Sequence, residues 1–421
     1  MRPPLVYSLP IADYLDHVTQ EHIDFDFSRS QSFADHLKKH FPLPPSILIG
    51  GTNGKGSTLA FLKNILIAHN IRVGGFTSPH LIDVKERIQI NHAPISHKDF
   101  EMIGAEVLAI FKNLDLTCTY FETMTFLAWM YFSKQKPDVC LFEVGLGGRL
   151  DTTNTIDRFG SIITKIDMDH MDLLGPTLSH IAQEKLPILS PSGFNVMAKQ
   201  DVSIKSQIRN HLKTLAVCKT EHDDFSHSHN DMDYSFHSKD FQINSIELGL
   251  RGKHQATNAS LALSMALEVF KEKKILPNPK KIEAGLASTR IAGRFDQHLY
   301  HDRTMILDIA HNPASVKGLV QTMRETYPNQ PLAVLLGCSG NKAHDNMHRQ
   351  LATLTGTIYT TAFKHPRSWK QFQNQKLDFT DLKTALSTIL IKTTQETLIL
   401  CTGSIFLIGN IKALLDKGNP G

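Results

Sequence analysis

A glycine-rich loop between an apolar run and a helical pattern constrains this chain more than any other sequence feature. The run 46–50 is short and apolar, as expected of a buried strand, and residues 57–69 carry apolar side chains at helical spacing. The segment between them is Gly51-Thr52-Asn53-Gly54-Lys55-Gly56-Ser57. Glycines allow consecutive backbone N–H groups to face an anion, and the start of the helix adds a favourable dipole. This succession predicts an α/β domain that binds a phosphate.

The polar residues of this loop fit the phosphates of a nucleotide. Lys55 would neutralise negative charge on the β- and γ-phosphates, and the hydroxyl of Ser57 or of its neighbour would support a metal ion. The loop departs from the common pattern G-x-x-x-x-G-K-[ST], because Gly56 separates the lysine from the serine. A glycine-rich turn without a ligand is the alternative, and the flanking strand and helix favour the phosphate site.

The rest of the first part of the chain alternates between strands and helices. The expected strands are 73–77, 138–144 and 161–167, and the expected helices are 98–112, 121–134 and 254–273. Such alternation implies a mostly parallel sheet with helices on both faces.

The segment from Cys218 to Leu250 differs from its surroundings in composition. His, Asp and Ser dominate it, and residues 234–250 alternate between polar and apolar, which predicts an antiparallel appendage. Its polar cluster consists of His222, Asp223, Asp224, His227 and His229. A solvated surface loop is favoured over a metal site, because no ligand spacing repeats. The role of residues 218–240 stays open.

A second alternation of strands and helices begins after the turn-rich segment 288–293. The expected strands are 304–310, 332–337, 357–362 and 397–402, and the expected helices are 314–327, 346–354, 381–393 and 405–416. This pattern predicts a small second α/β domain. We therefore expect two domains, 1–292 and 293–421, which suits a chain of 421 residues.

Composition and charge limit the classes of partner and compartment. The net charge of +4 gives no support to a nucleic-acid partner. Five widely spaced cysteines have no zinc or redox spacing, which fits a reducing compartment. The N-terminal residues lack the apolar core of a signal peptide, and no stretch approaches the ~18 to 20 apolar residues of a membrane helix. We expect a soluble, cytoplasmic protein with no membrane partner.

Polar residues stand near the ends of several predicted strands. Ser78 and Glu143 lie at or just beyond two of these ends, and a third leads into Asp167-Met168-Asp169-His170, which offers an imidazole or a carboxylate. Because ligands bind beyond the carboxyl ends of parallel strands, these side chains should meet the glycine-rich loop at one edge of the sheet. A phosphoryl-transfer site needs hard oxygen ligands around Mg2+ and positive charge on the phosphates. Together these residues predict a nucleotide–Mg2+ site.

Seven sequence blocks occur in a fixed order along the chain. They are Gly51–Ser57, Thr77–His80, Glu86–Ile88, Phe142–Asn154, His254–Ala259, Gly293–Phe295 and Asp308–Pro313. This series resembles the folylpolyglutamate synthase and dihydrofolate synthase family, within the Mur ligase superfamily. The resemblance covers nearly the whole chain, and seven ordered blocks are far more specific than a single motif.

The resemblance implies a fold and a reaction. The fold would be a P-loop parallel-sheet ATP-binding domain that also holds a pterin site, followed by a smaller Rossmann-like C-terminal domain. The reaction would be the ATP-dependent joining of L-glutamate to dihydropteroate and to the glutamate tail of folates, through an acyl phosphate. ATP and two Mg2+ ions are the implied cofactors. A monomer is the implied oligomeric state.

The resemblance also assigns roles to individual residues. Catalytic roles are implied for Lys55, His170, Lys185 and His311, and Lys185 matches a lysine that is carbamylated in many relatives. The implied metal ligands are Ser78, Glu143 and His170. The implied nucleotide contacts are Thr52, Asn53, Gly54, Lys55, Gly56, Ser57, Asn258, Arg294 and Asp308. The implied pterin contacts are Ile23, Asp24, Phe25, Thr119, Tyr120, Phe121, Glu122, Leu150, Asp151 and Thr152.

Other interpretations fit parts of the sequence. Tyr120 and Phe121 also suit ordinary core residues at a helix start, and Lys185 also suits an exposed helix lysine in a salt bridge. A folylpolyglutamate synthase without dihydrofolate synthase activity would use the same chemistry. A cell-wall Mur ligase would act on a UDP-sugar peptide, although the block Ser78–Leu81 resembles the folate branch. A nucleotide sensor would bind ATP without turnover, which the presence of Lys55, Glu143 and His170 argues against.

Overall fold

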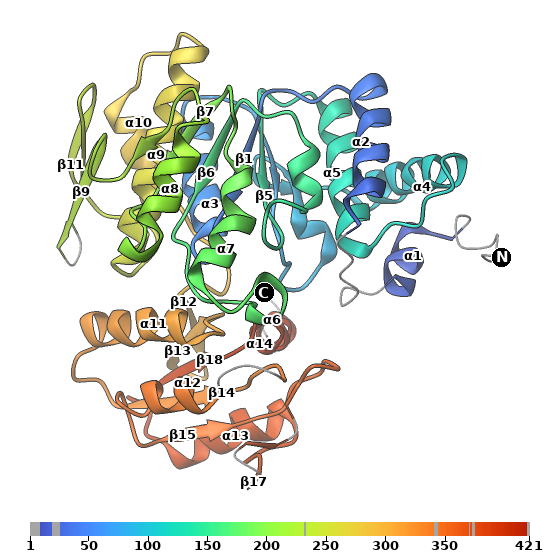
Figure 1. Cartoon of the computed structure of the whole chain (residues 1–421). Coiled ribbons are helices and arrows are strands. Elements are labelled where there is room, and N and C mark those ends of the chain that lie inside the picture. Colours follow the sequence, from blue (N-terminus) through green and yellow to red (C-terminus); the bar gives the residue numbers. More distant parts are fainter. Residues whose placement is uncertain are drawn as a thin grey trace.

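The computed structural model describes residues 9–18, 26–230, 233–340, 344–369, 371–372 and 375–418. Two α/β domains lie one above the other in Figure 1, and each is built around its own sheet. The chain passes from the larger to the smaller domain near residue 293, where Ile309 N–H donates to the Gly293 carbonyl at 2.8 Å. The division at 292/293 stays our prediction for the domain boundary.

The sheet of the larger domain has the order β4-β3-β2-β5-β1-β6-β7-β8 in the described residues. Its strands are β1 (Ser46–Gly50), β2 (Val73–Phe76), β3 (Ile88–Ile90), β4 (Ala93–Pro94), β5 (Val139–Glu143), β6 (Gly160–Ile163), β7 (Phe194–Met197) and β8 (Lys219–Thr220). The strands from β2 to β8 in this order run parallel, whereas β3 and β4 are antiparallel additions at one edge. Strand β1 lies between β5 and β6, so the loop that follows it opens at the middle of the sheet.

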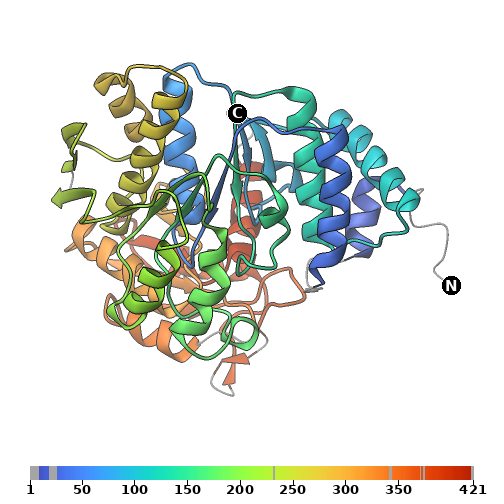
Figure 2. The same cartoon turned by 45° about the horizontal axis from the view of Figure 1, so that its top comes forward.

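Helices cover both faces of this sheet (Figure 2). One face packs against α1 (Ile11–His17), α2 (Phe27–His40), α4 (His97–Asn113) and α5 (Tyr120–Gln135). The other packs against α3 (Lys55–Ala68), α9 (His254–Glu272) and α10 (Pro279–Ala287). Alternate residues of β1 enter the two cores, since Leu48 faces the first and Ile47 and Ile49 face the second. This two-sided burial explains why β1 is apolar throughout.

Three further helices follow β6 and β7 along the chain. They are α6 (Met171–Leu174), α7 (Leu178–Lys185) and α8 (Lys205–Leu212). In Figure 1 the short α6 lies beside the smaller domain. Lys185 ends α7, and its Nζ donates to the Gly51 carbonyl at 3.0 Å, so the end of this helix lies beside the loop that follows β1.

A small antiparallel sheet packs on α9 at the outer side of the larger domain (Figure 1). Its strands are β9 (Phe225–Asn230), β10 (Asp233–Ser238) and β11 (Gln242–Ile246). The predicted appendage is therefore confirmed. The surface-loop interpretation holds for His222, Asp223 and Asp224, which are exposed in a turn, and is wrong for His227 and His229, which lie in β9. Phe225 is buried in the core beside α9, and the residues after it pair with β10.

The sheet of the smaller domain has the order β12-β13-β18-β14-β15. Its strands are β12 (Asp296–Tyr300), β13 (Arg303–Asp308), β14 (Leu332–Leu336), β15 (Ile358–Thr360) and β18 (Leu398–Thr402). Its helices are α11 (Pro313–Thr326), α12 (His344–Leu351), α13 (Leu382–Lys392) and α14 (Ile405–Gly418), and a separate hairpin pairs β16 (Gln371–Phe372) with β17 (Gln375–Lys376). The antiparallel β12 precedes four parallel strands. The predicted α/β class is confirmed for both domains.

The end of β6 departs further from its predicted position than the end of any other predicted strand. Strand β6 ends at Ile163 rather than at Asp167. The Thr164 hydroxyl donates to the Asn53 carbonyl at 2.7 Å, and Asp167 N–H donates to the Thr52 hydroxyl at 3.0 Å. These residues leave the sheet because they support the glycine-rich loop. Among the described residues, none of the helices is both long and apolar enough to cross a bilayer.

Candidate active site

A cavity of about 440 Å³ lies between the two domains. Its larger-domain wall is formed by segments that follow β1, β2, β5 and β6, together with residues near the start of α5. The register pairs Ile49 with Glu143 and Phe76 with Phe142, so these strands end side by side. The predicted meeting of the glycine-rich loop with Ser78, Glu143 and His170 at one cavity therefore occurs.

The glycine-rich loop has a backbone that other residues would strain. Gly51 has φ +133°, and an added Cβ would lie 1.9 Å from the Thr164 hydroxyl oxygen. Gly54 has φ +91°, and an added Cβ would lie 2.3 Å from Asn258 Oδ1. Tight packing against Thr164 and Asn258 therefore fixes the loop, and α3 begins directly after it. This arrangement points the start of a helix at the cavity, as anion binding requires.

Two lysines converge on one carbonyl of this loop. Lys55 Nζ donates to the carbonyls of Gly51 and Thr52 at 3.2 Å each, and Lys185 Nζ donates to the Gly51 carbonyl at 3.0 Å. Burial lowers the pKa of Lys55, and burial together with the Lys55 charge lowers the pKa of Lys185 to about 7. Two ammonium groups this close repel each other, so an anion placed at the loop would relieve that repulsion.

A buried carboxylate faces the loop from the end of β5. Glu143 is 6% exposed, and its Oε2 accepts a hydrogen bond from Ser78 N–H at 3.0 Å. Burial raises the pKa of Glu143, and the nearby Lys55 charge opposes this shift. Gly56 lies beside it, since an added Cβ there would be 3.5 Å from Glu143 Oε2. Carboxylate and hydroxyl oxygens are ligands that Mg2+ prefers, so Glu143 and Ser78 fit one divalent cation.

A second metal ion would have fewer protein ligands than the first. His170 lines the cavity but is exposed, and it precedes α6 with φ +48°. Nowhere in the described residues do three or more His, Cys, Asp or Glu side chains gather into a metal-binding group. Any metal at this site would therefore take part of its coordination from bound phosphate or water.

The aromatic part of the cavity lies at the start of α5. Thr119, Tyr120, Phe121 and Glu122 all line it, together with Leu150, Asp151 and Thr152. Glu122 and Thr119 form a capping box, and Glu122 Oε1 also accepts from Ser30 Oγ at 2.8 Å. Asp151 accepts from the backbone N–H groups of Gly145, Leu146 and Thr153. The carboxylates of Glu122 and Asp151 therefore stabilise the conformation of this wall.

Some predicted site residues are not among those that line the cavity. Ser57 is buried in α3, and Asn258 Nδ2 donates to Gln255 Oε1 at 2.9 Å beneath Gly54. Asp308 accepts from the N–H groups of Phe295 and Ala310, at 2.9 and 2.8 Å, so it organises the inter-domain linker. The remaining residues predicted on the basis of the resemblance, Ile23, Asp24 and Phe25, lie outside the described residues.

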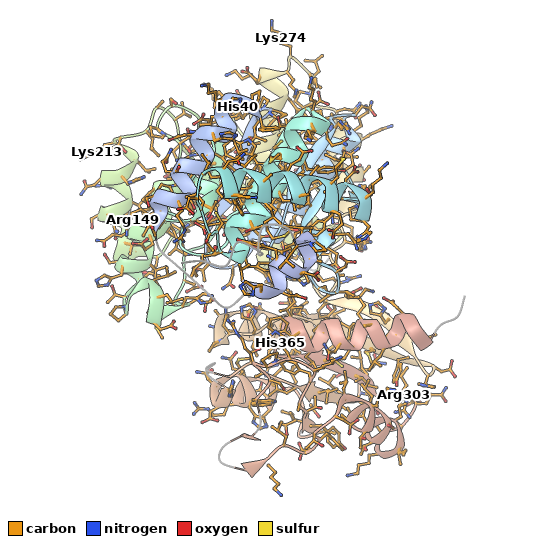
Figure 3. All side chains as sticks on the ribbon, turned by 90° about the vertical axis from the view of Figure 1, so that its right-hand side faces the viewer. His40, Arg149, Lys213, Lys274, Arg303 and His365 are labelled. Atoms are coloured by element: carbon orange, nitrogen blue, oxygen red, sulfur yellow. The ribbon has the colours of Figure 1, made fainter. Side chains whose placement is uncertain are left out.

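The smaller domain supplies the opposite wall of the cavity. Arg294 and His311 were predicted and line it. The sequence interpretation missed Ser339, His365, Arg367, Ser404 and Phe406. Three of these residues follow the carboxyl ends of β14 and β18, so the rule that was applied to the first sheet would have found them in the second. In Figure 3 His365 lies on the side of the smaller domain that faces the larger one.

Direct contacts also join the domains. Asn312 caps α11, and its Nδ2 donates to Asp169 Oδ2 at 3.2 Å. Asp169 also lines the cavity, next to His170. On another side of the junction, Lys253 and Glu325 form an ion pair at 2.8 Å. The cavity is therefore closed by the position of the smaller domain rather than by one domain alone.

Comparisons with known proteins agree with this arrangement. Residues 49–266 match the Mur ligase middle domain, and residues 293–405 match the glutamate ligase domain of Mur ligases. The dihydrofolate synthase/folylpolyglutamate synthase of Bacillus subtilis is 30% identical over 394 residues, which cover 87% of this chain and 89% of that protein.

Solved structures share the whole architecture. The structure of E. coli FolC in complex with DHPP and ADP superposes with a TM-score of 0.87 at 26% identity and covers 98% of this chain and 99% of its own. A bifunctional folylpolyglutamate synthase/dihydrofolate synthase with Mn, AMPPNP and L-glutamate bound gives a TM-score of 0.84 at 25% identity and covers 97% of this chain and 99% of its own. This chain belongs to the dihydrofolate synthase and folylpolyglutamate synthase family of Mur ligases.

Proposed function

We propose that this protein uses ATP to join L-glutamate to dihydropteroate and to the glutamate tail of folates. One observation carries the proposal. A single cavity combines a phosphate-binding loop, a buried carboxylate, an aromatic wall and a second wall from the domain that matches a glutamate ligase. A ligase that activates a carboxylate with ATP needs these parts within one space.

The chemistry needs two displacements. A carboxylate oxygen of the acceptor attacks the γ-phosphorus of ATP, the bond from that phosphorus to the bridging oxygen breaks, and ADP leaves. The amino nitrogen of L-glutamate, after losing a proton, then attacks the carbonyl carbon of the acyl phosphate. The amide bond forms, and inorganic phosphate leaves. Because water would hydrolyse the acyl phosphate, the two domain walls must exclude it.

Residues at the loop supply binding and charge. Thr52, Asn53, Gly54 and Gly56 would contact the phosphates through their backbone, and Lys55 would leave the Gly51 carbonyl for the β- and γ-phosphates. Ser78 and Glu143 would hold one Mg2+, and His170 would hold a second. Bound Mg2+ neutralises phosphate charge and lets two anions approach each other.

Lys185 is proposed to carry a carbamate. Its neutral amine would attack the carbon of CO2, and loss of a proton would leave an anion that supports the second Mg2+ together with His170. The shift of its pKa to about 7 supports this, because only the neutral amine reacts with CO2. The side chain is buried, which contradicts the alternative of an exposed helix lysine.

The aromatic wall is proposed to hold the pterin. Tyr120 and Phe121 offer ring faces to a flat heterocycle, and Asp151 offers a carboxylate to its amidine-like edge. From the other side, Arg294 and His311 would reach the nucleotide or the incoming glutamate. Asn258 and Asp308 would act from behind the cavity by fixing Gly54 and the linker. Catalysis would then require domain closure.

We propose that the protein works in a reducing compartment. We also propose that it is a monomer. All five cysteines are free thiols, and four of them are buried. The oligomeric state can be checked by sedimentation. Neither proposal affects the assignment of the reaction.

The test is ADP release by the purified protein with Mg2+, ATP and L-glutamate. Turnover with dihydropteroate and with tetrahydrofolate supports the bifunctional assignment. Turnover with the folate alone would favour a folylpolyglutamate synthase, which the sequence leaves open. ATP binding without ADP release for either acceptor would contradict the proposal.

A further inference from the structure

Arg87 is a buried cation in the cavity wall to which neither the sequence motifs nor the proposed mechanism gives a role. It ends a short helical turn (Val84–Arg87) between β2 and β3, and it is 4% exposed. It lines the cavity together with Ser78, Pro79 and Tyr120. An arginine is seldom buried without a partner for its charge, so its surroundings are informative.

The segment around Arg87 holds its side chain in a defined place. Arg87 Nε donates to His80 Nδ1 at 2.9 Å, and the Arg87 carbonyl accepts from Thr77 N–H at 2.9 Å. The Glu86 carboxylate accepts from the backbone N–H groups of residues 81, 82 and 83 at 2.8 to 3.0 Å. The connection between β2 and β3 is therefore a rigid support, as a preorganised binding residue requires.

The position of Arg87 lies between the two halves of the proposed site. Its guanidinium carbon is 5.2 Å from the centre of the Tyr120 ring, which belongs to the aromatic wall. The charge of Glu143, the proposed metal ligand, also acts on it. The cations Lys55 and Lys185 are instead directed at the Gly51 carbonyl of the phosphate loop.

We propose that Arg87 binds the carboxylate of the pteroate or folate acceptor, and that His80 is a positioning residue for its guanidinium. The inference rests on the proposed function. Because Arg87 lies near both Tyr120 of the aromatic wall and Glu143 beside the phosphate loop, an acceptor held at that wall would bring its carboxylate past Arg87. A planar guanidinium matches a carboxylate with two parallel N–H donors. After phosphoryl transfer the same group stabilises the remaining carbonyl oxygen, which gains negative charge when the glutamate amine attacks.

The first experiment compares binding of pteroate with binding of its carboxamide, in the presence of a non-hydrolysable ATP analogue. We expect the wild-type protein to prefer the carboxylate by about 10- to 100-fold, the range of a charge-assisted hydrogen-bonded pair. Arg87→Gln should lose this preference while its affinity for the carboxamide stays within about threefold of wild type. Arg303→Gln is the matched control, because that arginine is held by Thr393 and by the Leu390 carbonyl and lies away from the junction in Figure 3.

Different outcomes separate this inference from the proposed function. If wild-type protein binds neither ligand while it binds the ATP analogue, both the proposed function and the inference are wrong. If wild-type protein binds both ligands and Arg87→Gln keeps the preference for the carboxylate, the inference alone is wrong. The same holds if Arg87→Gln weakens both ligands equally, because Arg87 then supports the pocket rather than the carboxylate.

The second experiment tests the role of His80 in positioning Arg87. His80→Leu removes the acceptor for Arg87 Nε–H, whereas His80→Asn replaces it with an amide oxygen. We expect His80→Leu to reduce the preference for the carboxylate by about tenfold and His80→Asn to recover most of it, with unchanged affinity for the ATP analogue. Equal behaviour of the two variants would show that His80 does not act through this hydrogen bond.

Discussion

The two walls of the cavity are built in different ways. The larger-domain wall contains a contiguous loop, residues 51–57, whose backbone is fixed by Thr164 and Asn258. The smaller-domain wall comes from separate loops, and of its polar side chains Arg367 is exposed and His365 is half-buried. His365 stacks on Phe406 with ring centres 3.6 Å apart.

This difference indicates that the two walls bind different substrates. A rigid, strand-supported loop suits the nucleotide, whose phosphates are the same in every cycle. A wall on a separate domain suits the substrate that reacts after phosphoryl transfer, because such a domain can close over it. If the two walls have these separate roles, changes in each should affect different kinetic parameters.

Loss of the loop lysine should have the largest effect. Lys55→Ala removes the cation proposed to move from the loop carbonyls to the phosphates, and we expect kcat to fall by about 10²- to 10³-fold. Steady-state ADP release measures this change. Lys165→Ala, which alters an exposed lysine near the same loop, is the control and should change kcat by less than about twofold. A similar loss of kcat in both variants would contradict the proposed role of Lys55 at the phosphates.

A change in the smaller-domain wall should affect a different parameter. Arg367→Gln removes a cation from the wall opposite the phosphate loop, and we expect the KM for L-glutamate to rise by about tenfold or more. The KM for ATP should change by less than about threefold. Initial-rate measurements with each substrate varied in turn separate the two values. Equal increases for ATP and L-glutamate would contradict the division between the walls.

The proposed carbamate should make activity depend on pH and CO2. Because the pKa of Lys185 is lowered to about 7, its ammonium form predominates below that pH and its neutral form above it. We expect added bicarbonate to raise activity several-fold near pH 8 and to have little effect near pH 6. A carbamate signal in 13C NMR with labelled bicarbonate should follow the same trend and be absent in Lys185→Ala. Activity independent of bicarbonate at both pH values would contradict the carbamate.

The inter-domain ion pair should have the smallest effect. Lys253 and Glu325 are 53% and 28% exposed, so Glu325→Gln should cost at most about 1 kcal/mol of unfolding free energy. Thermal unfolding measures this cost, and the kcat should stay within about twofold of wild type. A larger loss of kcat would mean that this contact helps to set the closed position of the domains.

Local patterns in the sequence predicted the larger-domain wall well. Strand β1 was predicted at its observed bounds, and β5 within one residue at each end, because buried parallel strands are continuous apolar runs. The loop after β1 was predicted because its glycines and lysine are adjacent in sequence. The cavity residues Ser78, Glu143 and His170 followed from the rule for strand ends.

Contacts between distant segments were not predictable in this way. Helices α1, α2 and α10 were missed, and Ser30 of α2 meets Glu122 across 92 positions of sequence. The buried face of α2 includes Phe33, which packs on Phe126 of another helix. Arg87 was given no role in the cavity for the same reason, since nothing within its own segment indicates that Tyr120 and Glu143 lie near it.

The acyl phosphate intermediate can be tested most directly by following oxygen atoms from the acceptor carboxylate. The acceptor is labelled with 18O in its carboxylate, and the phosphate released during turnover is analysed by mass spectrometry. We predict that each phosphate carries one oxygen from the acceptor, because that oxygen leaves with the phosphoryl group when the amide forms. Product amide accompanied by unlabelled phosphate would show that no acyl phosphate forms, and would contradict the account.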